Sequence, residues 1–270
     1  MPEGDTVWLT AHRLNAALRG QELTVGDLRV PQLATTDLRG ETVTEVVARG
    51  KHLLTRFASG HTLHSHLRMD GSWFLTKAGV RPTRSPEHMI RAQLGNANWL
   101  ATGYRVHDLR IVATDHEDDI VGHLGPDLLG PEWDPERAVA NLAAQPDIAI
   151  GETLLDQRLL AGIGNMYKCE VLFVERLDPW LPTGAVPDLA KVVATAHRFL
   201  RANRDHPEQS TTGRAGRGQE HWVYGRSGAP CLRCRTPIRY AEQGEAPRAR
   251  ATYWCPRCQP RSPASGRPSG

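Results

Sequence analysis

Two CxxC pairs lie near the end of the chain, and twenty residues separate them. The first pair is Cys231 and Cys234, and the second is Cys255 and Cys258. In a chain without a secretion signal, this spacing predicts a tetrahedral zinc site with four cysteine ligands, and disulfides are the weaker alternative. An interval of this length suits a β-hairpin with one pair at each end. Because four thiolates leave zinc no open coordination position, we expect one structural zinc ion without a catalytic role.

The remaining cysteine, Cys169, lies in an apolar stretch with helical spacing, so we expect it to be a buried structural thiol.

The 270 residues suffice for two or three domains. No apolar run approaches the ~20 residues of a membrane span. The start of the chain lacks the basic and apolar regions of a signal peptide. We therefore expect a cytoplasmic protein that does not contact a membrane.

Charge is unevenly distributed along the chain. Residues 201–270 contain 13 Lys and Arg against 5 Asp and Glu, whereas the remainder contains 20 basic and 25 acidic residues. A basic C-terminal region fits a polyanionic partner such as nucleic acid. A merely solubilising tail is the other interpretation.

The order of local patterns predicts a multidomain α+β chain. Residues 5–19 have helical spacing, short β-like runs occupy 21–114, and Gly-Pro breakers follow near residue 125. We expect an N-terminal antiparallel β-sandwich with a leading helix (1–124), a helical domain (125–219), a zinc-finger β-hairpin (220–260) and a disordered tail (261–270). Within this plan, helices are expected at 135–144, 152–161, 165–176 and 187–203, and a mobile polar segment at 205–219.

The chain begins MPEGDT. If Met1 is removed, Pro2 carries a secondary α-amine, and α-amino groups titrate near ~8, so part of it is unprotonated at neutral pH. Unprotonated amines attack carbonyl-type carbons and form Schiff bases. Glu3 would then serve as a proton carrier beside the amine. The alternative is that Pro2 is a common start and Glu3 a solvated charge.

The stretch Gly162-Ile163-Gly164-Asn165 interrupts two helical patterns. Its glycines permit a tight turn close to another surface. Asn165 and the amides of a helix N-terminus can bind a phosphate. An ordinary corner between two helices is the other interpretation.

Together, MPEG, RGKHLL, GIGN and RATYWC occur in one order along the chain. Over residues 1–260 the chain resembles the bacterial family of formamidopyrimidine-DNA glycosylases and endonuclease VIII. The resemblance implies that the helical domain is a helix–two-turn–helix domain. It also implies a monomeric bifunctional DNA glycosylase and abasic-site lyase that acts on damaged DNA, with the choice between duplex and single-stranded DNA left open.

The resemblance assigns roles to four residues and adds a phosphate contact. Pro2 matches the family's nucleophile and Glu3 its proton carrier. Lys51 in RGKHLL matches the proton donor for β-elimination, and Arg250 in RATYWC the proton donor for δ-elimination. Both cations would also hold phosphates around the lesion, and Asn165 matches the phosphate-binding asparagine.

Several features separate the two branches of the family. MPEGDT, LLDQRLLAGIGN and ETVTEVVARGKHLLTRF are closer to endonuclease VIII, and the lysine that the oxidised-purine branch carries near Gly151 is absent. VYGR at 223–226 is instead similar to the purine branch. We expect oxidised pyrimidines as the preferred substrates, with oxidised purines as the alternative.

Further DNA contacts follow by looser resemblance. Met69 in HLRMDGSW could fill the space left by a flipped nucleotide, or be a buried strand residue. Arg110 is similar to one arginine of the purine branch's loop, and His88 could approach a phosphate. His64 and His66 share one strand face, and we interpret them as structural or DNA-facing because the sequence suggests no third metal ligand.

Two other classes of function compete with the enzyme. A zinc-dependent DNA-binding module would bind lesions without forming a covalent complex, but Pro2, Glu3, Lys51 and Arg250 are all present. A small tautomerase with a proline base would have neither a zinc hairpin nor a basic C-terminal region.

Overall fold

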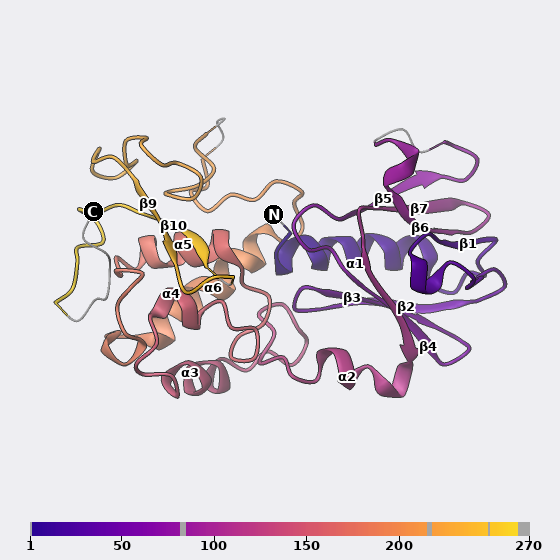
Figure 1. The fold of residues 1–270 in the computed structure, drawn as a ribbon, viewed down its shortest axis with the longest axis horizontal. Coiled ribbons are helices and arrows are strands. Elements are labelled where there is room, and N and C mark those ends of the chain that lie inside the picture. Colours follow the sequence, from indigo (N-terminus) through magenta and orange to yellow (C-terminus); the bar gives the residue numbers. More distant parts are fainter. Residues whose placement is uncertain (1, 82–84, 215–217, 248, 264–270) are drawn as a thin grey trace. The chain divides into compact units, whose positions relative to one another are not determined.

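The computed structural model describes residues 2–81, 85–214, 218–247 and 249–263. The chain divides into two compact units, Met1–His123 and Leu124–Gly270 (Figure 1). No helix in these described ranges is both long and apolar enough to cross a membrane.

The first unit is a sandwich of two four-stranded antiparallel sheets. The strand order is β1-β6-β7-β5 in one sheet and β2-β3-β4-β8 in the other. The strands are β1 (Val25–Leu28), β2 (Val43–Arg49), β3 (His52–Phe57), β4 (His61–His66), β5 (Ser72–Lys77), β6 (Ile90–Gly95), β7 (Trp99–Tyr104) and β8 (Asp108–Ala113). Short helical turns accompany them: η1 (Pro31–Leu33), η2 (Glu87–Met89), η3 (Thr114–His116) and α2 (Asp118–Val121).

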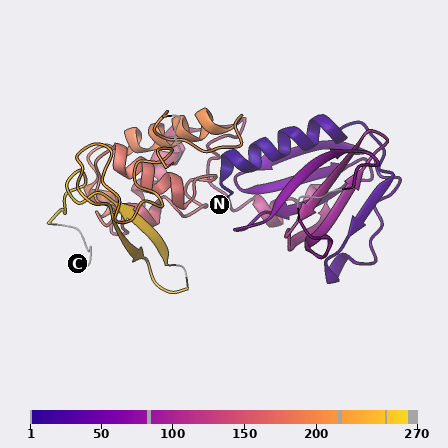
Figure 2. The same cartoon turned by 90° about the horizontal axis from the view of Figure 1, so that it is seen from above.

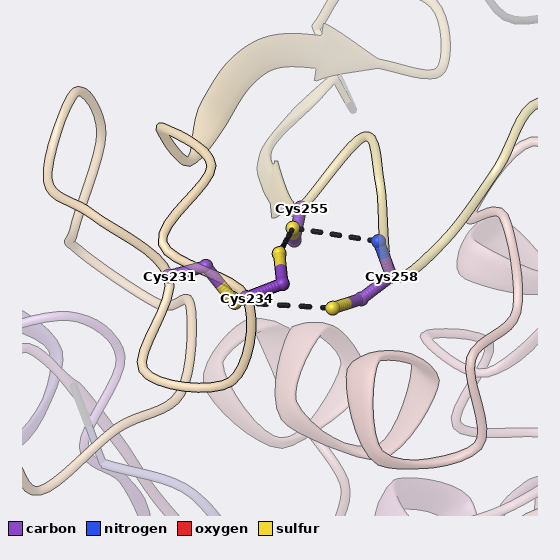
Figure 3. Close-up of side chains that lie close together, drawn as sticks. All are labelled: Cys231, Cys234, Cys255 and Cys258. Atoms are coloured by element: carbon purple, nitrogen blue, oxygen red, sulfur yellow. Dashed lines mark hydrogen bonds between the residues drawn. The ribbon is translucent and has the colours of Figure 1, made fainter.

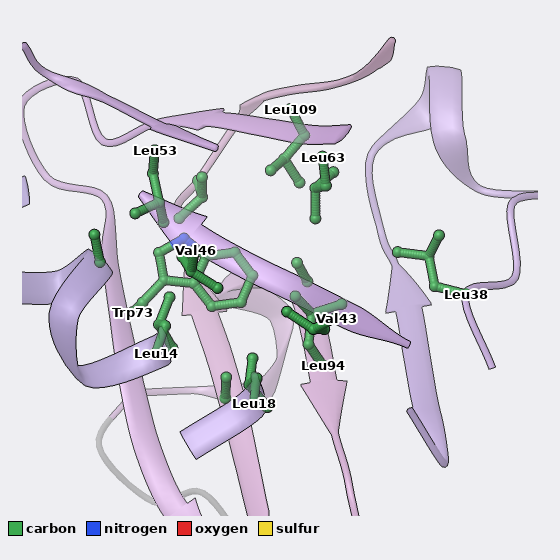
Figure 4. Packing of buried hydrophobic residues seen from close by; sticks show 14 of the residues in the cluster. Leu14, Leu18, Leu38, Val43, Val46, Leu53, Leu63, Trp73, Leu94 and Leu109 are labelled. Atoms are coloured by element: carbon green, nitrogen blue, oxygen red, sulfur yellow. The ribbon is translucent and has the colours of Figure 1, made fainter. Parts of the chain in front are cut away.

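Helix α1 (Gly4–Leu18) shares one hydrophobic core with both sheets. Val7, Ala11, Leu14 and Leu18 recur at three- and four-residue steps, so they line one face of the helix and are buried. They pack with Val43, Val46, Leu53, Leu63, Trp73, Leu94 and Leu109 of the strands (Figure 4). Each such leucine contributes about 1.5–3 kcal/mol through burial. A hydrogen bond from the Val46 backbone N to Asn15 Oδ1 (2.9 Å) also ties the helix to β2.

The described part of the second unit contains four helices: α3 (Pro135–Ala143), α4 (Ile150–Thr153), α5 (Asn165–Val174) and α6 (Leu189–Asn203). A short turn, η4 (Thr183–Ala185), precedes α6. Asp134 and Asp188 cap α3 and α6, because their carboxylates accept hydrogen bonds from the backbone N of Arg137 and Lys191, each at 2.9 Å. The helices enclose a second core, and α5 is buried along most of its length.

The hairpin of β9 (Arg239–Gln243) and β10 (Arg250–Trp254) follows the helices in the chain. Figure 2 shows it projecting from the helices of the second unit. Its register pairs Arg250 with Gln243 and Thr252 with Ala241.

Two sequence predictions differ from the structure, and two strands were not predicted individually. The helix predicted at 152–161 is wrong beyond Thr153, because the side chain of Gln157 donates to Leu155 O and Ile163 O and accepts from Gly162 N. The sequence patterns do not predict strands β1 and β6 individually. Part of the segment predicted as mobile, around Thr211, is bound to α5 through a buried side-chain hydrogen bond.

Two other predictions are untested. The division of the second unit between 219 and 220 stays a prediction. Residues 264–270 of the tail predicted as disordered lie outside the described residues.

Candidate active site and cysteine cluster

Pro2 and Glu3 lie at the N-terminal end of α1. Glu3 is the N-cap residue, with an extended backbone, and its carbonyl oxygen accepts from Val7 N at 3.0 Å. Pro2 is half-buried directly before it, whereas Glu3 is only 1% exposed. The positive end of the helix dipole therefore lies beside a carboxylate and the residue that would carry the α-amine. A buried carboxylate at this position differs from the solvated charge of the alternative interpretation.

Lys51 lies in the tight turn between β2 and β3. Arg49 pairs with His52, so Gly50 and Lys51 form a two-residue hairpin loop. Gly50 has φ +57°, a left-handed conformation that glycine adopts without steric cost. The half-buried Lys51 is thus fixed at the end of a strand pair whose other residues belong to the sandwich.

Three histidines meet next to Lys51. His52, His64 and His66 come from β3 and β4; His52 Nδ1 lies 2.9 Å from His64 Nε2, and the rings of His52 and His66 meet edge to face at 4.9 Å. His123 lies near the same group, 6.4 Å from the His52 ring. Burial lowers the pKa of His52 to about 3 and the pKa of His64 and His66 to about 4 each. The three imidazoles are therefore uncharged at neutral pH, consistent with a structural role.

The other predicted DNA contacts of the first unit lie on its surface. Met69 is 72% exposed in the loop after β4, so it is not the buried strand residue of the alternative interpretation. Arg110 is an exposed residue of β8, opposite His64 in the register and 3.7 Å from Asp108. His88 is exposed in η2. Each side chain is accessible to a ligand of this unit.

In the second unit, Asn165 contacts the strand that carries Arg250. Asn165 begins α5, and its Nδ2 donates to the carbonyl oxygen of Ala251 at 2.7 Å. Its Oδ1 is buried and has no hydrogen-bond partner among the residues that the structure describes. An amide nitrogen carries two hydrogens, so one remains for a further acceptor such as a phosphate oxygen. Arg250 is exposed at the start of β10, and its Nη1 donates to Ala249 O at 2.9 Å.

Lys168 holds the same strand from deeper inside the unit. Its Nζ donates to Thr252 Oγ1 at 2.6 Å, and that hydroxyl donates to Gln243 Oε1 at 3.0 Å. The amide of Gln243 in turn donates to Pro179 O at 2.7 Å. All three side chains are buried.

Glu170 binds the segment that precedes the first CxxC pair to α5. Its Oε1 accepts from the backbone N of Val223 (2.8 Å) and Tyr224 (2.9 Å), and its Oε2 from Trp222 N (2.7 Å) and from the hydroxyl of Thr211. The VYGR motif thus anchors the region before the first CxxC pair. Helix α5 therefore uses Asn165, Lys168 and Glu170 to bind both the hairpin and the chain leading to it.

The four predicted metal ligands come together at the base of the hairpin (Figure 3). All four sulfur atoms lie within 4.8 Å of one another; Cys231 and Cys258 are 3.9 Å apart, and Cys234 and Cys255 3.4 Å. These separations exceed a disulfide bond and match the roughly 3.8 Å edge of a tetrahedron with Zn–S bonds of about 2.3 Å. Burial raises the pKa of the Cys255 and Cys258 thiols, so a bound cation would be needed to stabilise these two residues as thiolates. The donor set fits a divalent metal ion.

Cys169 is a buried thiol, as predicted. Sequence reasoning missed Lys168, Glu170, Thr252 and Gln243. The available signal was a Lys and a Glu inside the otherwise apolar run that follows GIGN, because charged residues are seldom fully buried unless paired.

Comparisons with known proteins place this geometry in a family. Residues 1–114 match the formamidopyrimidine-DNA glycosylase N-terminal domain, and residues 124–199 match the formamidopyrimidine-DNA glycosylase H2TH domain. A crystal structure of Lactococcus lactis Fpg in complex with DNA containing an abasic site has a similar fold, with TM-score 0.80 and 23% identity over 96% of this chain and 100% of that chain.

Sequence relatives point to one branch. The chain is 56% identical to a probable endonuclease 8 2 of Streptomyces coelicolor, over 96% of this chain and 94% of the relative. It is 46% identical to the DNA-(apurinic or apyrimidinic site) lyase Nei2 of Mycolicibacterium smegmatis, over 96% and 99%. It is 32% identical to endonuclease 8 of Klebsiella pneumoniae, over 96% and 100%. The chain therefore belongs to the formamidopyrimidine-DNA glycosylase and endonuclease VIII family, and within it is endonuclease VIII-like.

Proposed function

We propose that this protein is a bifunctional DNA glycosylase and abasic-site lyase of base excision repair. The observation that carries the proposal is the position of Pro2 and buried Glu3 at the N-terminus of α1 in a chain of this family. The names of the relatives, endonuclease 8 and DNA-(apurinic or apyrimidinic site) lyase, support this activity over that of a DNA-binding module without catalysis.

The reaction begins at the damaged nucleotide, which must leave the base stack to be reached. With Met1 removed, the Pro2 nitrogen attacks C1′ of the deoxyribose, and the bond from C1′ to the base breaks. Glu3 donates a proton to the ring oxygen, so the sugar opens and a Schiff base to Pro2 forms. The base leaves with the electron pair of its glycosidic bond and takes up a proton.

Strand cleavage follows from the Schiff base. The positive imine nitrogen acidifies the C2′ hydrogen; loss of that proton expels the 3′ phosphate, and a second elimination expels the 5′ phosphate. Lys51 and Arg250 serve as proton donors for the first and second eliminations, and both hold phosphates around the lesion. Asn165 contributes its second amide hydrogen to a phosphate, and Met69, Arg110 and His88 contact DNA from the first unit.

Zinc is the metal we assign to the four cysteines, as one structural ion. Four sulfur ligands would saturate it, so its contribution is a rigid hairpin that presents Arg250. We further propose that the second unit divides near residue 219 into a helix–two-turn–helix domain and the zinc hairpin. The protein would act as a monomer on DNA in the bacterial cytoplasm.

Oxidised pyrimidines are the proposed substrates. The endonuclease 8 names of the relatives and the absence of a lysine near Gly151 support this choice over oxidised purines.

Two experiments test the function. Borohydride reduction with an abasic-site oligonucleotide should trap the protein, and mass spectrometry should place the adduct on Pro2; an adduct on a lysine would overturn the assignment. A panel of oligonucleotides with single oxidised pyrimidines or purines, in duplex and single-stranded form, should show faster excision of the pyrimidines. Faster excision of formamidopyrimidine or 8-oxoguanine would establish the alternative.

A further inference from the structure

Lys168, Thr252 and Gln243 form a buried polar chain to which the proposed chemistry assigns no part. Its hydrogen bonds run in one direction, from Lys168 Nζ to Thr252 Oγ1 (2.6 Å), from that hydroxyl to Gln243 Oε1 (3.0 Å), and from Gln243 Nε2 to Pro179 O (2.7 Å). Lys168 and Thr252 are 0% exposed, and Gln243 is 3% exposed. Each group in the chain therefore donates to the next, and its end is fixed on the backbone.

These hydrogen-bonded side chains hold the two strands of the hairpin at the position of Arg250. Gln243 is the cross-strand partner of Arg250 in the hairpin register, and Thr252 follows Arg250 by two residues on the same strand. The Thr252 hydroxyl also lies 3.3 Å from the carbonyl oxygen of Arg250 itself. A shift of the hairpin away from α5, or along it by one residue, would break these hydrogen bonds and move Arg250.

Burial of an ammonium group carries a desolvation cost, and an apolar side chain of similar length would avoid it. Directed hydrogen bonds differ from apolar contacts because a slip of one residue along a strand leaves a donor or acceptor unpaired. The best-established role of such buried polar groups in proteins is to select one register out of several possible ones.

Gly151 provides a second, independent indication that this chain of side chains is built into the fold. A Cβ atom at Gly151 would lie 2.4 Å from Gln243 Oε1 and 2.9 Å from Pro179 O. The space that Gln243 occupies therefore depends on a residue without a side chain.

We propose that Lys168, Thr252 and Gln243 are positioning residues for Arg250, which hold the hairpin on α5 so that the guanidinium serves the second elimination. The inference rests on the role proposed for Arg250. Loss of these side-chain hydrogen bonds should reduce δ-elimination. It should affect β-elimination, which is assigned to Lys51, much less. A purely structural role would instead lower both steps together with stability or metal content.

The test compares Thr252→Val, which removes the hydroxyl at constant shape, with Thr252→Ser, which retains it. The zinc-loaded proteins are given an abasic-site oligonucleotide in single turnover, and the ratio of δ- to β-elimination product is measured. We expect Thr252→Val to lower the ratio by about fivefold or more, because the hydroxyl's hydrogen bonds with Lys168 and Gln243 are both lost, and Thr252→Ser to stay within about twofold of the unaltered protein. Gly151→Ala, which displaces Gln243, should lower the ratio in the same direction.

Zinc content and melting temperature are measured for every variant, and Lys168→Met is the second arm if Thr252→Val loses zinc. Arg250→Ala is run in parallel and should give the lowest ratio. If Arg250→Ala lowers the ratio but zinc-loaded Thr252→Val or Lys168→Met does not, the positioning role is overturned. If Arg250→Ala leaves the ratio unchanged, the role proposed for Arg250 fails instead.

Discussion

The side-chain amide of Asn165 donates a hydrogen bond of 2.7 Å to the carbonyl oxygen of Ala251, the residue that follows Arg250. The first residue of α5 is thereby joined to the strand that presents the guanidinium. Because Asn165 Nδ2 has a second hydrogen, one nitrogen can bind the hairpin and a phosphate together. The family resemblance assigns a phosphate contact to Asn165 and to Arg250, and this hydrogen bond therefore links the positions of the two residues.

Asn165→Asp tests this connection. The aspartate keeps the shape but has no hydrogen to donate, so it would set an acceptor against Ala251 O and a negative charge against phosphate. We expect affinity for abasic-site DNA to fall by at least tenfold, measured by fluorescence anisotropy, because a hydrogen bond is lost and a repulsion gained. Asn141→Asp on α3 is the matched control, because that asparagine also donates to a backbone carbonyl oxygen, Leu159 O. Equal affinities for Asn165→Asp and the unaltered protein would contradict a DNA contact at this position.

Local patterns predicted much of the fold and the metal site. Helices α1, α5 and α6 follow from apolar spacing, and the cysteine cluster from two CxxC pairs, because both signals act within a few residues. The helix predicted at 152–161 has the same apolar spacing, but the Gln157 side chain takes the place of helical hydrogen bonds there. Strand β1 is four residues long and contains Gly and Asp, so its formation depends on pairing with β6.

The missed parts of the site depend on contacts between distant residues. Lys168 and Thr252 are 84 positions apart, and only the register of the hairpin on α5 brings them together. His52 meets His64 and His66 because β3 pairs with β4 in one register. A sequence shows the residue types in such groups, but the partner of each residue is set by tertiary packing.

Glu3→Gln separates proton transfer from nucleophilic attack. The substitution keeps the size of the side chain but removes the carboxylate, so base excision from a single-lesion oligonucleotide should fall by about 10²-fold or more. A pre-formed abasic site already presents an aldehyde and needs no base departure, so its cleavage should fall much less. Gel assays of both substrates under single-turnover conditions provide the comparison. Equal losses on both would mean that Glu3 acts only through the structure around Pro2.

Glu170→Gln tests the anchor of residues 222–224. One carboxylate currently accepts from three backbone N–H groups and one hydroxyl. An amide would direct its own N–H groups at some of these donors, so we expect a loss of about 2–3 kcal/mol in the free energy of unfolding. Urea denaturation measures it, with Glu136→Gln, on the first turn of α3, as the control. A loss below that of Glu136→Gln would show that the anchor is dispensable.

The histidine group makes stability depend on pH. Burial lowers the pKa of His52 to about 3 and the pKa of His64 and His66 to about 4, from an ordinary value of 6.5. As pH falls below about 6.5, the unfolded chain binds protons that the folded chain does not, so each histidine removes up to about 1.4 kcal/mol per pH unit until its folded pKa is reached. Melting temperature should therefore fall between pH 7 and pH 5.

His52→Asn and His61→Asn distinguish this origin from general acid sensitivity. His61 is exposed at the start of β4, so its substitution should leave the pH dependence unchanged. His52→Asn removes one of the buried groups and should make the loss of melting temperature between pH 7 and pH 5 smaller. An identical pH dependence in all three proteins would exclude the histidine group as its cause.

Metal exchange tests whether the four cysteines have only a structural role, and substitution of Arg250 tests the DNA contact that the hairpin makes. If the four cysteines only build the hairpin, cadmium or cobalt in zinc's place should preserve cleavage, because thiolate geometry is kept. Cys255→Ser should weaken DNA binding by misplacing Arg250, and Arg250→Ala, with metal retained, should reproduce most of that loss. Loss of one phosphate contact should also reduce the slope of log K against log salt by about one. Unchanged affinity, salt slope and cleavage products in Arg250→Ala would show that the hairpin serves DNA binding through other residues.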